Sequence, residues 1–233
     1  LRCLVGSEMC IRDSFQTITG VEDNLREYVR DAYSQPVLPY HVPVLVVSYF
    51  PVRDGRIDRA VTGDVDGLYD QVKHHTVETT WKVAQALENG SAYHLYKNPL
   101  AVQSLRYHIV ESIEFQEPLP TWSKPGKSVP MTDYNAIIER IDARRWVEQE
   151  GIKEIWIWGY HGGVIDLWES NMSGPFGDIS NSDRDPNDLP IFSKTYTVYH
   201  YNYQRGPSEA VENHMHQIEA VLREVDRPLF WDK

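Results

Sequence analysis

Hydrophobic residues gather in four short runs that are typical of β-strands. Residues 43–50 are mostly β-branched or aromatic and end before a turn-like Arg-Asp-Gly. Residues 104–115 show the alternation of a half-buried strand, and residues 194–203 also predict a strand. Residues 154–159, Glu-Ile-Trp-Ile-Trp-Gly, are almost continuously apolar, which is typical of a central strand covered on both faces. The pattern therefore predicts four strands.

Three longer stretches repeat their apolar residues at helical spacing. The first follows Asp64, a candidate N-cap, and stops at Asn89-Gly90. The second covers residues 132–147, and the third follows Pro207, a residue favoured in the first turn of a helix. His214 lies beside the inner stripe of this last helix and is predicted to be buried. That stripe is predicted to consist of Val211, Met215, Ile218, Val221, Leu222 and Val225.

The order of these elements predicts an α/β fold. Strands and helices alternate, which favours a mostly parallel sheet built by right-handed crossovers, with helices on both faces in a three-layer arrangement. We expect a lead-in over residues 15–41 and a single α/β domain over residues 42–233. The segment between the last two strands, residues 161–193, has no clear periodicity and is predicted to be a long loop of the functional kind.

The first fourteen residues are expected not to be native protein. They resemble the conceptual translation of a transposase sequencing adapter, whose codons give the ten residues 4–13, Leu-Val-Gly-Ser-Glu-Met-Cys-Ile-Arg-Asp. Both cysteines, Cys3 and Cys10, lie in this stretch, so the native chain is predicted to hold no disulfide, thiolate metal site or cysteine nucleophile. The native start is then missing, and the compartment stays open, a secreted or periplasmic one included.

Charge and hydropathy exclude two classes of partner. The 233 residues include 34 acidic and 23 basic side chains, for a formal net charge of −11. Such a surface repels phosphate backbones, so we expect no nucleic-acid partner. No apolar run approaches the roughly 20 residues of a membrane span, so we expect no membrane insertion. The expected ligand is a small molecule, a glycan or a peptide.

Candidate catalytic residues concentrate around the long segment. His161 follows the apolar strand directly, at the strand end where ligands bind in open α/β sheets, and two glycines follow it. Glu169 lies eight residues on and is a candidate general base or metal ligand. Arg205, before the last helix, is a candidate clamp for a carboxylate or other anion, and His216 is a candidate proton shuttle or ligand.

A divalent metal, zinc or calcium, is the candidate cofactor. Its predicted ligands are His161, Glu169, Asp178 and His216, although their spacing matches no known zinc motif. Residues 183–187 place oxygen ligands alternately, as calcium loops do. Asp188 and Lys194 stand where an EF-hand needs glycine and glutamate, which excludes an EF-hand and leaves a looser calcium site or an ordinary turn.

Aromatic and amide side chains offer a binding surface near the same strand ends. Trp168, Asn202 and Tyr203 are the candidate substrate-binding residues, because aromatic rings stack on sugar rings and on peptide side chains. The alternative for the aromatic rings is burial in the core. These residues favour either a hydrolase-like, metal-dependent enzyme or a non-catalytic module that binds carbohydrate or surface ligands.

Several motifs resemble those of a family of uncharacterised bacterial proteins. They are Glu-Ser-Asn-Met at 169–172, Gly-Asp-Ile-Ser-Asn-Ser at 177–182, Tyr-Gln-Arg-Gly at 203–206 and the spacing Glu212, His216, Glu219. The resemblance covers most of residues 42–233. It implies that relatives keep counterparts of residues such as Glu169, Arg205 and His216 but replace His161, and that their chains continue beyond the position of Lys233.

Overall fold

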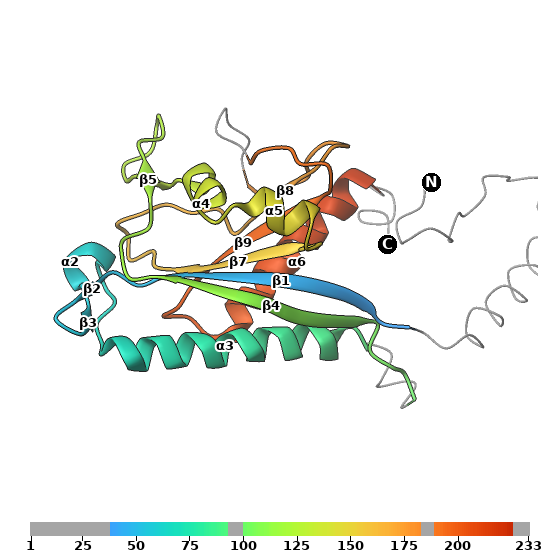
Figure 1. Cartoon of the computed structure of the whole chain (residues 1–233), viewed down its shortest axis with the longest axis horizontal. Coiled ribbons are helices and arrows are strands. Elements are labelled where there is room, and N and C mark those ends of the chain that lie inside the picture. Colours follow the sequence, from blue (N-terminus) through green and yellow to red (C-terminus); the bar gives the residue numbers. More distant parts are fainter. Residues whose placement is uncertain (1–37, 93–99, 183–188, 226–233) are drawn as a thin grey trace, which may run out of the picture. The chain divides into compact units, whose positions relative to one another are not determined.

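The computed structural model describes residues 38–92, 100–182 and 189–225 (Figure 1). The chain divides into two units, Leu1–Leu38 and Pro39–Lys233, and every described helix and strand belongs to the second. The expectations for the adapter-like residues 1–14 and for most of the lead-in fall outside the described residues.

A five-stranded sheet organises the second unit. Its order is β4 (Leu105–Phe115), β1 (Tyr40–Tyr49), β7 (Glu154–Gly159), β9 (Tyr196–Asn202) and β8 (Ser170–Ser173). The first four strands are parallel to their neighbours, and β8 is antiparallel to β9. The four predicted strands and the mostly parallel α/β sheet are confirmed.

The segment between the last two predicted strands holds a strand that the sequence pattern missed. Residues 161–193 were predicted to be one long loop, whereas Ser170–Ser173 pairs with β9 as the edge strand β8. Ser170 and Ser173 are buried because their hydroxyls find partners, Gln217 Oε1 at 2.8 Å and the carbonyl of Pro190 at 3.1 Å. A strand buried through hydrogen bonds shows no hydrophobic alternation.

The first long helix, α3 (Tyr69–Gly90), begins later than expected. Asp64 does not cap it, since the N-cap position is Leu68, which makes no side-chain capping bond. The preceding backbone is held by the hairpin of β2 (Val52–Arg53) and β3 (Arg56–Ile57), because the Ile57 N–H donates to the carbonyl of Gly67 at 3.0 Å. The short helix α2 (Arg59–Thr62) lies between this hairpin and α3.

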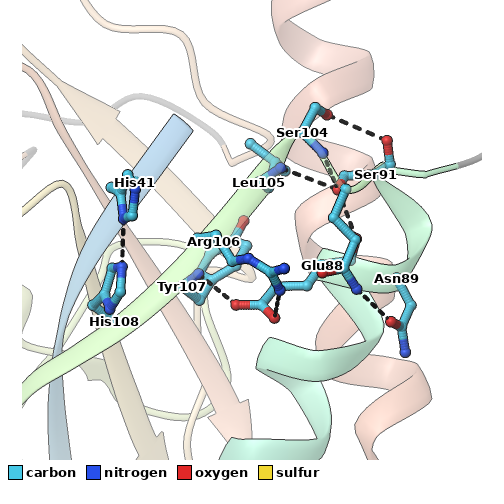
Figure 2. A network of polar contacts seen from close by, with 10 residues as sticks. His41, Glu88, Asn89, Ser91, Ser104, Leu105, Arg106, Tyr107 and His108 are labelled. Carbon is cyan, nitrogen blue, oxygen red and sulfur yellow. Dashed lines mark hydrogen bonds and ion pairs between the residues drawn. The ribbon is translucent and has the colours of Figure 1, made fainter. Parts of the chain in front are cut away.

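A polar network joins the end of α3 to the start of β4, as Figure 2 shows. The Glu88 carboxylate accepts from the backbone N–H of Tyr107 at 2.8 Å and from Arg106 Nη1 at 3.1 Å. The Ser91 hydroxyl oxygen accepts from the backbone N–H of Leu105 at 3.1 Å. These bonds satisfy N–H groups of an edge strand and fix it to the helix.

The second predicted helix is two short ones. After the small strands β5 (Thr121–Trp122) and β6 (Met131–Thr132), α4 (Tyr134–Arg140) and α5 (Ala143–Glu148) share the predicted apolar stripe. They are separated at Asp142, whose φ of 52° is left-handed. A residue in that conformation cannot continue a right-handed helix.

The last helix, α6 (Pro207–Val225), starts where predicted but buries a different face. Its buried residues are Ala210, His214, Gln217 and Ala220. The predicted inner stripe is wrong in part: Met215, Ile218 and Val225 are 41%, 49% and 48% exposed, whereas Val211, Val221 and Leu222 are half-buried. Small alanines allow close approach to the sheet, and His214 is buried, as predicted, with its Nε2 2.6 Å from the Tyr201 hydroxyl.

The core is built mainly on β1 and β7. Val44, Val47, Ile155 and Ile157 are 0% exposed. α3 packs against α6 and β4. The chain leaves β1 for β2, β3 and α2, and leaves β4 for β5, at the same end of the sheet (Figure 1). No helix in the described ranges is long and apolar enough to cross a membrane.

Candidate functional site

A cavity of about 300 Å³ opens at the carboxyl ends of β7 and β9, beside the start of α6. This is the edge at which open α/β sheets bind ligands. Its polar wall residues come from the strands, from the segment after β7 and from α6. They are His161, Asp166, Glu169, His200, Asn202, Arg205, Glu209 and Asn213. Four predicted site residues, His161, Glu169, Asn202 and Arg205, are thereby brought to one cavity.

Glu169 is held from two sides through a single carboxylate oxygen. Its Oε2 lies 2.8 Å from His216 Nδ1 and accepts from Asn181 Nδ2 at 2.6 Å. Oε1 has no hydrogen-bond partner in the described part of the chain. The bond to Glu169 raises the pKa of His216, and the Glu212 carboxylate 3.9 Å from His216 Nε2 adds to this effect. The pairing of Glu169 with His216 across 47 residues joins two of the predicted site residues.

His161 sits at the start of the segment after β7. Its Nδ1 accepts from the Gly163 N–H at 3.3 Å, which leaves Nε2 as the nitrogen that carries the proton. The glycine after it serves the fold, because at φ 50° a Cβ on Gly162 would collide with the Thr62 carbonyl oxygen. The close approach that Gly162 permits is therefore to the neighbouring backbone of the protein.

His200 is a site residue that the sequence did not indicate. It is 1% exposed, and burial lowers its pKa to about 3, so the imidazole is neutral. Its Nδ1 lies 2.9 Å from the Tyr134 hydroxyl, while Nε2 has no partner. In the sequence, this histidine lies in a strand between tyrosines, and no spacing or motif distinguishes it from a core residue.

Unpartnered buried polar atoms mark the same edge of the sheet. Among the described residues, four side-chain atoms are buried without a hydrogen-bond partner: Tyr49 Oη, Trp158 Nε1, His200 Nε2 and Tyr203 Oη. All four residues lie close to the carboxyl end of β1, β7 or β9. Buried polar atoms in folded proteins are nearly always paired, so exceptions gathered in one place point to a function.

The remaining predicted binding residues lie differently. Trp168 is 4% exposed, does not line the cavity, and stacks on Tyr134 with ring centroids 4.9 Å apart. Tyr203 is buried and lines a neighbouring cavity of about 430 Å³. The Oδ1 of Asn202 accepts from the backbone N–H of Gln204 at 2.9 Å, while Arg205 is exposed at the rim.

The charged groups of the cavity differ in how they are compensated. Asp166 pairs with Lys127 at 2.7 Å, Glu169 is bound by His216, and the Glu209 carboxylate accepts from the Ser208 hydroxyl at 2.7 Å. Arg205 forms no ion pair with any described residue. The bond from the Ser208 hydroxyl and, to a lesser degree, the positive charge of Arg205 lower the pKa of Glu209, so Arg205 already acts on one carboxylate of the cavity.

The predicted metal ligands do not assemble into a site. Glu169 and His216 bond directly to each other, and Asp178 does not line the cavity. In the part of the chain that the structure describes, no group of three or more His, Cys, Asp or Glu side chains is placed to hold a metal ion. The predicted calcium loop at residues 183–187 lies outside the described residues.

No protein-family model matches the chain, and no curated protein is similar to it.

Proposed function

We propose that the protein is a hydrolase-like enzyme that acts on a small molecule in the cavity at the carboxyl ends of β7 and β9. The observation that carries the proposal is Glu169, which lines this cavity with one carboxylate oxygen held by His216 and Asn181. A carboxylate fixed through one oxygen and unpartnered at the other is the arrangement that a general base needs.

In the proposed reaction, Glu169 Oε1 accepts a proton from a water molecule as its oxygen attacks the scissile centre. The new bond joins the water oxygen to that centre, and the bond to the leaving group breaks. The leaving group takes the proton that Glu169 accepted from the water, and His161, whose Nε2 carries a proton, donates a hydrogen bond to it. His216 acts as a positioning residue, because it holds Glu169 without lining the cavity. Arg205 orients a polar group of the substrate from the rim.

The test is hydrolysis of a chromogenic panel of p-nitrophenyl acetate, phosphate and hexosides by the wild type and by Glu169→Gln. We expect turnover of at least one substrate and a loss of about 100-fold or more in the variant, the usual contribution of a general base. The matched control is Glu139→Gln on the exposed surface of α4, which should retain full activity. No turnover by the wild type, or equal turnover by Glu169→Gln, contradicts the proposal.

Elemental analysis tests the metal separately. The proposed reaction routes no step through a metal, since the residues described do not form a three-ligand site. We expect no stoichiometric metal in the purified protein. One equivalent of zinc or another transition metal in the wild type, lost in Glu169→Gln, would contradict this reaction. It would support instead the metal-dependent hydrolase that the residue types suggested.

The second candidate is a non-catalytic module that binds a glycan or another surface ligand. The aromatic side chain of Trp158 in the cavity wall favours it, because aromatic rings bind ligands by packing against them, without chemistry. Saturable glycan binding without turnover of the panel would identify this function.

We infer further that helices cover both faces of the sheet. β4 and β7 lie on opposite sides of β1. The crossover from β1 to β4 contains α3, and the crossover from β4 to β7 contains α4 and α5. Right-handed crossovers in opposite directions place their helices on opposite faces.

A further inference from the structure

We propose that His41 and His108 form a surface site for a transition-metal ion, Cu²⁺, Ni²⁺ or Zn²⁺, with water completing its coordination. The two side chains lie in the amino-terminal halves of β1 and β4, whereas the cavity of the proposed function opens at the carboxyl ends of β7 and β9. Neither histidine lines that cavity. The site therefore stands independently of the proposed hydrolase.

The strand register places the two histidines on one face of the sheet. The parallel ladder pairs Pro43 of β1 with His108 of β4. Side chains two residues apart on a strand point to the same face, so His41 lies on the face of Pro43 and is the diagonal neighbour of His108. Diagonal neighbours are within reach of ring side chains. Both histidines are exposed, so an ion can reach them from solvent.

The two rings direct one nitrogen each at the same point. His41 Nδ1 lies 2.5 Å from His108 Nε2, and Figure 2 shows the rings turned toward one another. The ring planes are 10° apart and the centroids 4.8 Å apart. Rings stacked face to face could not bring two nitrogens this close, so they meet end to end with their in-plane lone pairs converging. A single proton between the nitrogens occupies this position, and a metal ion that displaces it accepts both lone pairs.

A metal ion fits between these nitrogens after a small movement. Zinc–nitrogen bonds of about 2.0–2.1 Å at a tetrahedral angle place two ligand nitrogens roughly 3.3 Å apart. His41 Nδ1 and His108 Nε2 must therefore separate by about 0.8 Å, which exposed side chains achieve by rotation. The strand itself need not move, because Arg106 and Tyr107 of β4 are bonded to Glu88 beside the site (Figure 2).

The donor set selects the class of ion. Imidazole nitrogen suits copper, nickel and zinc, whereas Ca²⁺ and Mg²⁺ take oxygen ligands. Among the described residues, no third His, Cys, Asp or Glu is placed to join the pair, so water fills the remaining positions. For a given set of nitrogen ligands, Cu²⁺ binds more tightly than Ni²⁺ or Zn²⁺. We therefore expect Cu²⁺ to be the strongest ligand of this site.

The surrounding charge does not oppose a cation. Arg106, two residues before His108, is paired with Glu88 at 3.1 Å, so its positive charge is compensated. The chain has a formal net charge of −11, which attracts cations. Structural metal sites usually have four protein ligands, and a site with two holds its ion more weakly. We expect the ion to be lost during purification and to bind again when it is added.

The first experiment is an NMR titration of the whole, untagged protein with ZnCl₂, followed through the imidazole C–H signals. We expect the signals of His41 and His108 to shift together and to saturate at about one Zn²⁺ per chain. The signals of His74, an exposed histidine of α3, should not shift before them. The proposal is overturned if other histidines respond first, or if His41 and His108 do not respond at up to about 1 mM Zn²⁺.

Variants test the pair as a chelate in a calorimetric titration with Cu²⁺. His41→Gln and His108→Gln each remove one ligand and should weaken binding about 10-fold or more, since changes behind a ligand already cost about 10- to 100-fold. The loss in the double variant should be much smaller than the product of the two single losses, because one imidazole cannot chelate.

His74→Gln is the matched control and should bind Cu²⁺ as the wild type does. Equal affinity of His108→Gln and the wild type refutes the site, and so does a double variant whose loss is the full product of the single losses. The zinc titration of the wild type decides the question even if a variant fails to fold.

Glu169→Gln separates this site from a metal in the cavity. Because neither His41 nor His108 lines the cavity, this variant should bind Cu²⁺ with the affinity of the wild type. A metal that Glu169→Gln loses and His108→Gln keeps would belong to the cavity and would contradict the assignment to the histidine pair. Loss of hydrolase activity in Glu169→Gln with unchanged Cu²⁺ binding supports both proposals separately.

Discussion

A buried carboxyl group at the amino end of β7 makes the stability of this protein depend on pH. Glu154 lies beneath α6, with its side chain 14% exposed. Its carboxylate accepts from Trp156 Nε1 at 2.8 Å, and burial raises its pKa from 4.5 to about 7. The neighbouring His214 Nδ1 is 4.0 Å away, but burial lowers the pKa of this histidine to about 3, so it offers no positive charge.

The direction and size of the effect follow from these pKa values. Between pH 4.5 and 7 the folded protein keeps the Glu154 proton and the unfolded chain loses it, so stability falls as the pH rises. At about 1.4 kcal/mol for each pH unit, the interval from 4.5 to about 7 corresponds to roughly 3 kcal/mol. Glu154→Gln is neutral at every pH and retains an acceptor for Trp156. The free energy of unfolding of the variant, relative to that of the wild type, should therefore rise by about 3 kcal/mol from pH 4.5 to pH 8.

The assay is urea unfolding of both proteins at pH 4.5, 5.5, 6.5, 7.5 and 8, with Glu139→Gln on the surface as the control. Other titrating groups are common to the two proteins, so the difference between their unfolding free energies isolates Glu154. A difference that stays constant from pH 4.5 to 8 refutes the reasoning. It would mean that the folded protein ionises Glu154 as readily as the unfolded chain does.

Three further predictions concern single side chains. Gly162→Ala should destabilise by about 3 kcal/mol, because its Cβ meets a backbone carbonyl, whereas Gly163→Ala, with open space around it, should cost about 1 kcal/mol in the same urea assay. In an NMR titration, the pKa of His216 should lie above 6.5 in the wild type and fall toward 6.5 in Glu169→Gln; an unchanged value contradicts the pairing. Glu88→Ala leaves a backbone N–H of the edge strand unpaired and should cost about 1–3 kcal/mol, and a loss near zero would show that water replaces the carboxylate.

The sequence predicts elements well where burial and hydrophobicity coincide. The apolar run of β7 is 0–1% exposed from Ile155 to Trp158, and its bounds are those predicted. Where polar residues are buried through hydrogen bonds, the same reasoning fails. Gln217 of α6 accepts a hydrogen bond from Ser170 of β8. This one contact buries a polar residue on the helix and another on the edge strand, so the sequence pattern predicted neither the buried face of α6 nor the strand β8. Hydropathy assigns both residues to solvent, and 47 residues separate them.

The candidate site was predictable in place but not in full composition. The rule that ligands bind beyond the carboxyl ends of parallel strands located His161 and Glu169 at the observed cavity. His200 was not predictable, because its role depends on Tyr134 behind it and on a nitrogen without a partner, which no spacing encodes. The same holds for Trp158, because Trp156, two residues earlier in the same apolar run, has a satisfied N–H.

The two ends of the sheet treat buried polar groups in opposite ways, and this contrast supports a ligand site. Toward the amino end, Glu154 is bonded by Trp156, and His214 of α6 is bonded by Tyr201. Toward the carboxyl end, Trp158 and His200 are left without partners. Each group left unpaired in the folded protein costs about 1–3 kcal/mol.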